Sequence, residues 1–203
     1  LSPRDMVPLV SWLALRGRCR TCQQPIGWFA PAVELAAVLV VLWGASVVTN
    51  EVLIATCVFG WTLLALGLID VRRFLLPDSL CILLALEGLA ATFLLVPQNL
   101  VSHLVGGVAG GLFFLALAFA YRKLRGREGL GLGDAKLASA LGLWVCWQAL
   151  PSVVLFAAVI GLIFALAQSV AGGGLSRTMR LPLGTFLAAA AWIVWLYGPL
   201  VPA

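Results

Sequence analysis

The chain alternates long apolar runs with short polar or basic segments. A membrane-spanning helix needs about 20 consecutive, predominantly apolar residues. By this measure the sequence predicts about seven membrane-spanning helices, of which the fifth and seventh are the shortest. Their approximate bounds are 32–48, 52–69, 79–96, 100–121, 134–150, 153–170 and 186–196. The expected fold is therefore an all-α, polytopic transmembrane helix bundle.

Composition supports a membrane environment. Hydrophobic residues make up 63% of the 203 residues, charged residues make up 10%, and the mean hydropathy is +1.09. A soluble core of this size could not hide so much apolar surface, so we expect the lipid bilayer to solvate the chain. Pairs of glycines at 106–107 and 110–111 fit close packing between helices in such a bundle.

The basic residues predict the orientation of the spans, because loops rich in Lys and Arg stay on the cytoplasmic side. If residues 1–31 are cytoplasmic, all 13 Lys and Arg residues fall on that side, and the opposite loops around 50–51, 97–99 and 148–151 carry none. A seven-span topology then places the C-terminus outside. The net charge of +5 indicates orientation and contact with anionic lipids, and no nucleic-acid partner is expected.

Two carboxylates stand at the expected cytoplasmic ends of spans. Asp70 closes the run 52–69, and Asp134 begins the run 134–150 directly after Gly131-Leu132-Gly133. An ionisable group at membrane depth costs roughly 2.5–3.5 kcal/mol at a helix centre and less near the ends, so such residues are functional candidates. Two of them at one membrane face indicate an acid/base pair. Because a negative charge is disfavoured where a helix ends, the position of Asp70 is best explained by a function.

Neighbouring residues leave alternatives open. Asp78 lies on the same face; we expect it to be a helix N-cap, and it is a secondary acidic candidate for the site. Asp134 could also cap a helix. Gly131 and Gly133 could let the backbone approach a substrate closely, or they could form a plain loop turn. Lys136 could tune the protonation of the aspartate pair or extend toward lipid headgroups.

Five motifs follow one another along nearly the whole chain. They are the stretch 7–22, which ends in Cys19-Arg20-Thr21-Cys22, then Pro31-Ala32-Val33-Glu34-Leu35, Leu68-Ile69-Asp70 with Leu76-Pro77-Asp78, Gly131-Leu132-Gly133-Asp134-Ala135-Lys136-Leu137, and Leu181-Pro182-Leu183-Gly184-Thr185-Phe186. Together they resemble the bacterial type IV prepilin peptidases, a family of GxGD membrane aspartic peptidases. Thr185 stands where this family usually has proline.

The resemblance implies an aspartic endopeptidase of the bacterial inner membrane. Its substrates would be type IV prepilins or type II secretion pseudopilins, whose basic leader is removed at the cytoplasmic face, where the leader meets an apolar helix. Asp70 and Asp134 match the catalytic aspartates of the family. They would share one proton, so that one carboxylate activates water while the protonated one polarises the scissile carbonyl. The peptidase reaction implies no cofactor, whereas the family's common second activity, N-methylation of the new N-terminal residue, uses S-adenosylmethionine.

The cysteine pair Cys19 and Cys22 lies in the segment 1–31, which we treat as a cytoplasmic unit preceding a transmembrane peptidase bundle at 32–203. Its spacing is that of half a tetrahedral zinc site, and a reducing compartment disfavours a disulfide. The resemblance implies a second CxxC upstream. We therefore expect that an N-terminal segment with one further span has been removed, which would bring the spans to eight. A natural member with an incomplete zinc site is the alternative.

Two other classes of function remain open from the sequence. A proton- or cation-coupled transporter could use paired carboxylates, but transport favours ionisable residues near the membrane midplane and internal repeats. The two aspartates lie at one edge, and the sequence contains no evident repeat. A non-catalytic assembly factor could retain the same fold.

Overall fold

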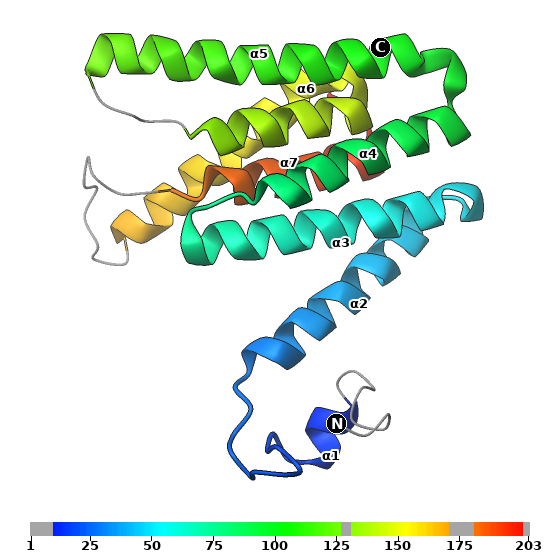
Figure 1. The fold of residues 1–203 in the computed structure, drawn as a ribbon, viewed down its shortest axis with the longest axis vertical. Helices are drawn as coiled ribbons and strands as arrows, with labels where there is room; N and C mark the ends of the chain where they lie inside the picture. Colours follow the sequence, from blue (N-terminus) through cyan, green and yellow to red (C-terminus); the bar gives the residue numbers. More distant parts are fainter. Residues whose placement is uncertain (1–9, 127–130, 171–180, 201–203) are drawn as a thin grey trace.

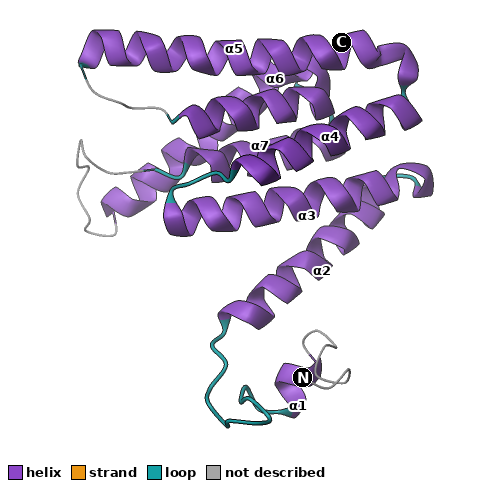
Figure 2. Cartoon of the chain, viewed as in Figure 1, coloured by secondary structure: helices purple, strands orange, loops and turns teal. Residues whose placement is uncertain are grey.

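The computed structural model describes residues 10–126, 131–170 and 181–200, and these parts are helical apart from turns and one isolated bridge between Arg18 and Pro25 (Figures 1 and 2). The basic residues Arg4, Arg127, Arg177 and Arg180, which helped to predict the topology, lie outside the described residues. The elements are α1 (Val10–Ala14), α2 (Phe29–Val47), α3 (Asn50–Arg73), α4 (Asp78–Leu95), η2 (Pro97–Asn99), α5 (Leu100–Arg125), α6 (Leu132–Gln168) and α7 (Leu183–Tyr197).

The all-helical class is confirmed, but the expected number of seven spans is not. Five helices, α2 to α6, are long and apolar enough to cross a membrane, and α7 is a shorter apolar helix of 15 residues. The expected fifth and sixth spans correspond to two helices that meet at Cys146 within α6. At Cys146 itself the backbone is not helical, with φ 61° and ψ 172°.

The break at Cys146 reverses the direction of the chain within α6. A Cβ atom on Gly110 of α5 would lie 2.5 Å from the carbonyl oxygen of Ala138 and 3.5 Å from Leu150, so residues on both sides of the break reach the same level of α5. Figure 1 shows that the first half of α6 runs away from the α5 end and that the second half runs back. The turn therefore lies close to the loop that the sequence predicts around 148–151.

Glycines allow α5 and α6 to pack at backbone distance. A Cβ atom on Gly106 would lie 2.5 Å from the carbonyl oxygen of Gly142, and a Cβ atom on Gly142 would collide with the Gly106 backbone. No other residue fits there, because such contacts are far below van der Waals separation. The close helix packing predicted from the glycine pairs is confirmed.

The buried core lies between α3, α4, α6 and α7. Trp144 stacks on Phe59 with ring centroids 4.4 Å apart, and Trp195 meets Trp144 edge-on at 5.3 Å. The indole N–H of Trp144 donates to the carbonyl oxygen of Leu84 at 2.8 Å, so the large ring is buried without an unpaired polar group. In contrast, α2 buries only Pro31 and Gly44 and diverges from the bundle toward its N-terminal end (Figure 1).

Candidate active site

Asp70 lies in the last turn of α3, which continues to Arg73 before Phe74 ends it in the left-handed conformation. The side chain is buried, with 5% of its surface exposed. One carboxylate oxygen, Oδ2, accepts a hydrogen bond from the backbone N–H of Thr185 at 2.9 Å, and the Thr185 hydroxyl lies 3.2 Å from the same oxygen. The sequence therefore places a carboxylate at a helix end, and the fold brings donors to it from another helix.

The donors belong to the N-terminus of α7. This helix follows Pro182, so Thr185 lies in its first turn, where backbone N–H groups have no partner within the helix. The positive end of the α7 dipole thus offsets the negative end of α3 at Asp70. The approach requires glycine at 184, because a Cβ atom there would lie 3.0 Å from the Asp70 Oδ2 atom. A proline at 185 would lack the N–H, so this bond requires a residue other than proline, and the second contact requires a hydroxyl.

Asp134 lies in the first turn of α6. Gly131 is the N-cap residue, with φ −79° and ψ 149°, and its N–H donates to the Asp134 Oδ2 atom at 3.2 Å. Asp134 is thus not the N-cap residue itself, although its charge is favourable at this helix N-terminus. Neither Gly131 nor Gly133 has a positive φ, so neither position needs glycine for a left-handed backbone. Glycine at 133 has a steric reason, since a Cβ atom there would lie 3.2 Å from Leu76.

Leu76 connects the two aspartate-bearing segments. Its side chain is 8% exposed and lies against both Gly133 of α6 and Gly184 of α7. The Asp70 carboxylate is close enough to Asp134 to act on it electrostatically. Residues far apart in the sequence therefore meet at one end of the bundle, around the short loop that joins α3 to α4.

Asp78 and Lys136 form an ion pair beside this site. The Lys136 Nζ atom donates to the Asp78 Oδ1 atom at 2.6 Å, and both side chains are exposed. Asp78 is the first residue of α4, whose N-cap is Pro77, and its side chain makes no capping bond. The expected capping role is therefore wrong, because the carboxylate pairs with a lysine from α6 instead. Lys136, two residues after Asp134, therefore pairs its charge with Asp78.

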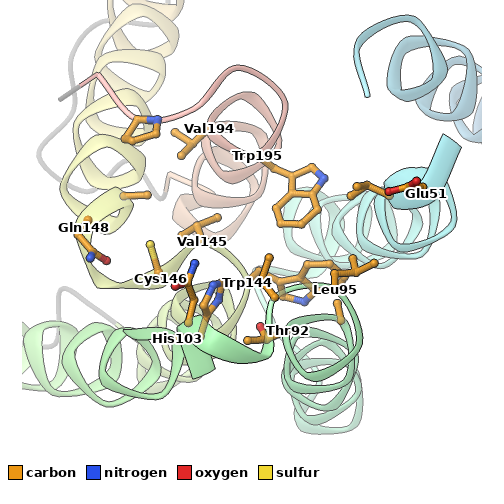
Figure 3. Close-up of a pocket in the computed structure, with 16 residues that line it drawn as sticks. Glu51, Thr92, Leu95, His103, Trp144, Val145, Cys146, Gln148, Val194 and Trp195 are labelled. Atoms are coloured by element: carbon orange, nitrogen blue, oxygen red, sulfur yellow. The ribbon is translucent and has the colours of Figure 1, made fainter. Parts of the chain in front are cut away.

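The opposite end of the bundle holds a cavity of about 400 Å³ with mostly apolar walls (Figure 3). The carbonyl oxygen of Leu143, close to the break at Cys146, lies 2.9 Å from the His103 ring and 3.3 Å from the Thr92 hydroxyl. In Figure 3, His103 and Thr92 lie beside Trp144 and Cys146. His103 thus stabilises the chain reversal and is remote from the aspartates.

Cys19 and Cys22 lie in a tight turn. The Cys19 N–H donates to Gln24 at 2.9 Å, and the Gln23 N–H donates back to the carbonyl oxygen of Cys19 at 3.0 Å. No group of three or more metal-ligating side chains forms within the parts of the chain that the structure describes. Two thiols are half of what zinc requires, so the residues present do not make a complete zinc site.

Sequence reasoning did not identify Gly184, Thr185 or Leu76 as parts of the site. The segment 181–186 was recognised only as a motif, and nothing in the sequence says that it contacts Asp70. Leu76 precedes Asp78 in another motif and looks like an ordinary apolar residue. The contacts become visible only when α7 is placed beside α3 and α6.

Comparison with known proteins gives a consistent result. Residues 57–166 match the Type IV leader peptidase family, and residues 1–48 match the Bacterial Peptidase A24 N-terminal domain. A protein of Aeromonas hydrophila named prepilin leader peptidase/N-methyltransferase is 39% identical over 195 residues, which cover 96% of this chain and 67% of that protein. Proteins of the same name from Burkholderia pseudomallei (strain K96243) and Pseudomonas aeruginosa are 40% and 37% identical, over 96% and 98% of this chain and 63% and 68% of theirs. No solved structure gives a significant match.

Proposed function

Because the chain belongs to the type IV leader peptidase family, we propose that it is a membrane aspartic endopeptidase that removes the basic leader from type IV prepilins or type II secretion pseudopilins. The chain spans about two thirds of the length of the curated relatives it matches. The observation that carries the proposal is the meeting of Asp70 and Asp134 at one end of the bundle around Leu76.

We further propose that this end faces the cytoplasm of a bacterial inner membrane. The described basic residues Arg72, Arg73, Arg122, Lys123 and Lys136 lie at the ends of α3 and α5 and at the start of α6. Basic residues favour the cytoplasmic side. If each half of α6 and the short α7 are counted as crossings, the chain crosses the membrane seven times. The scissile bond of a substrate with a cytoplasmic leader then lies at the level of the two aspartates.

In the proposed reaction the two aspartates share one proton. Thr185 holds the Oδ2 atom of Asp70, which leaves the Oδ1 atom to take a proton from water as the water oxygen bonds to the scissile carbonyl carbon. Protonated Asp134 donates a hydrogen bond to the carbonyl oxygen. The tetrahedral intermediate then loses its C–N bond, and the leaving amine takes the proton from Asp70.

The second activity in the relatives' name implies S-adenosylmethionine as methyl donor. The two cavities described do not fit this charged nucleoside beside the aspartates. The 400 Å³ cavity lies at the far end of the bundle, and the other, of 240 Å³, is small and apolar. No methylation step is therefore assigned to the described residues. Likewise, zinc would need two further ligands beside Cys19 and Cys22, so a zinc site is proposed only where such ligands are supplied.

The proposal is tested with Asp70→Asn and Asp134→Asn. Each protein is purified in detergent and mixed with a prepilin, and mass spectrometry of the product's N-terminus reports cleavage and methylation together. Each variant should lose nearly all cleavage, because neither leaves the pair with both a base and a proton to donate. The matched control is Glu51→Gln, which neutralises an exposed carboxylate at the other end of α3. Substantial cleavage by a folded Asp134→Asn protein refutes the mechanism.

A further inference from the structure

A second cavity, of about 240 Å³, opens between α2, α3 and α7. Its walls are apolar apart from one threonine hydroxyl. The residues that line it include Val40, Gly67, Leu68, Thr185, Ala189 and Trp192. We refer to it as the α3/α7 groove.

The groove reaches Thr185, which bonds to the candidate catalytic carboxylate. Thr185, which lines the groove, bonds to Asp70, and its hydroxyl also lies 3.0 Å from the carbonyl oxygen of Gly67 on the opposite wall. A molecule that occupies the groove therefore has one end against Thr185, the residue that bonds to Asp70. The 400 Å³ cavity has no such connection, since it lies at the other end of the bundle.

The shape of the groove follows from the way α2 crosses α3. The two helices touch where a Cβ atom on Gly60 would collide with Val40, and the Trp61 indole N–H donates to Ala37 at 3.1 Å. Below this crossing α2 diverges toward Phe29 (Figure 1). The groove is thus bounded in the middle of the bundle by this crossing, and at the aspartate end of α3 the Arg72 guanidinium lies 3.3 Å from the centroid of the Phe29 ring of α2.

The size and lining of the groove indicate what it can hold. Its volume is below the roughly 300–1,000 Å³ that is usual for small-molecule pockets, so it fits side chains from one face of a helix better than an enclosed ligand. Gly67 and Ala188 are buried where α3 meets α7, and the exposed Ala189 leaves room for another helix to approach, as small residues do between membrane helices. Trp192 is 7% exposed, and its indole N–H has no acceptor among the described residues. Because this N–H is buried, it does not bear on the choice of occupant, and a helix in the groove would meet the apolar lining.

We propose that the α3/α7 groove receives the apolar helix of the substrate, immediately after the bond that is cleaved. This rests on the proposed function, which requires a peptide bond at Asp70 and an apolar segment continuing into the bilayer. The groove begins at Thr185, next to Asp70, runs toward the middle of the bundle and is apolar along this length. Its direction and chemistry therefore match such a segment.

The proposal is tested by substituting an exposed residue of the groove with a larger one. Ala189→Trp places a large ring in the groove without replacing a buried residue, and Ala116→Trp places the same ring on an exposed position of α5, at the far edge of the bundle. With a full-length prepilin, Ala189→Trp should raise KM at least tenfold and change kcat less than about twofold. Ala116→Trp should leave both within twofold. Equal KM values for the two folded variants overturn the proposal.

A cross-linking measurement keeps the proposal testable if Ala189→Trp does not fold. Ala189→Cys in the Asp134→Asn background should form a disulfide with a cysteine in the apolar helix of the prepilin, and Ala116→Cys should not. Cross-linking only between two copies of this chain, or none while the prepilin is bound, overturns the groove assignment. Absence of cleavage by the unsubstituted chain refutes the proposed function instead, so the two failures are distinguishable.

Discussion

Gly184→Ala is the substitution that tests most directly how tightly the Asp70 carboxylate is held. The added Cβ atom would lie 3.0 Å from the Asp70 Oδ2 atom and 3.0 Å from both Cδ atoms of Leu76. Contacts between carbon and oxygen normally occur at about 3.3–3.6 Å. Relief therefore requires a movement of roughly 0.3–0.6 Å, shared between the carboxylate and Leu76.

The expected effect on activity is larger than that on stability. A displacement of about 1 Å in a catalytic geometry can reduce the rate by about 100-fold, so a movement about half as large should reduce kcat about tenfold, or about 1.4 kcal/mol. Overpacking costs typically 1–3 kcal/mol, but alanine is favoured over glycine in a helix by up to about 1 kcal/mol. We therefore expect a loss of stability of about 1 kcal/mol.

Gly44→Ala is the matched control. Its Cβ atom would lie 3.1 Å from the Thr56 methyl group, so the steric conflict is similar, but it occurs near the other end of α3. Both variants are compared with the unsubstituted protein by initial rates of prepilin cleavage and by thermal unfolding in detergent. Gly44→Ala should lose similar stability and keep kcat.

Two results would refute this reasoning. Full kcat in a folded Gly184→Ala protein would show that the Asp70 carboxylate does not need its contact with the α7 N-terminus. An equal fall in kcat for Gly44→Ala would show that general loosening of the bundle, and not displacement of Asp70, lowers the activity.

Three further predictions concern individual contacts. Thr185→Val removes the hydroxyl and keeps the N–H, so kcat should fall about threefold to tenfold by loss of one charge-assisted bond, and Thr185→Ser should restore it; equal values for Val and Ser would contradict this. Lys136→Met breaks an exposed ion pair with Asp78 and should change the free energy of unfolding by about 0–1 kcal/mol, with a smaller effect at high salt; a larger, salt-independent loss in denaturant titrations would count against it. Cys19→Ser with Cys22→Ser should retain cleavage and show no loss of bound zinc by metal analysis, since two thiols hold zinc poorly; one zinc per unsubstituted chain would prove that expectation wrong.

The sequence was sufficient for the class of fold and for most helix positions, because hydropathy alone determines where apolar helices can lie. It predicted α3 and α4 within a few residues, and it placed Asp70 and Asp134 at helix ends. It placed the turn between the fifth and sixth spans around 148–151, whereas the chain breaks at Cys146, because Cys146 carries no turn signal and Pro151, which does, lies beyond the reversal. It also assigned Asp78 to a cap, because a partner from α6 is not visible in local sequence.

The break at Cys146 has a consequence for the catalytic end of the bundle. α3 ends at Arg73, with Asp70 in its last turn. α4 leads away from that end, α5 returns to it, and the first half of α6 leads away again. Without a reversal, α7 would begin at the far end, and Thr185 could not reach Asp70. Because the chain turns back at Cys146, the second half of α6 returns and α7 begins beside the last turn of α3. His103 and Thr92 contact the carbonyl oxygen of Leu143 beside this turn and stabilise it. They therefore support the active site from the opposite end of the molecule, because the turn is what brings α7 to Asp70.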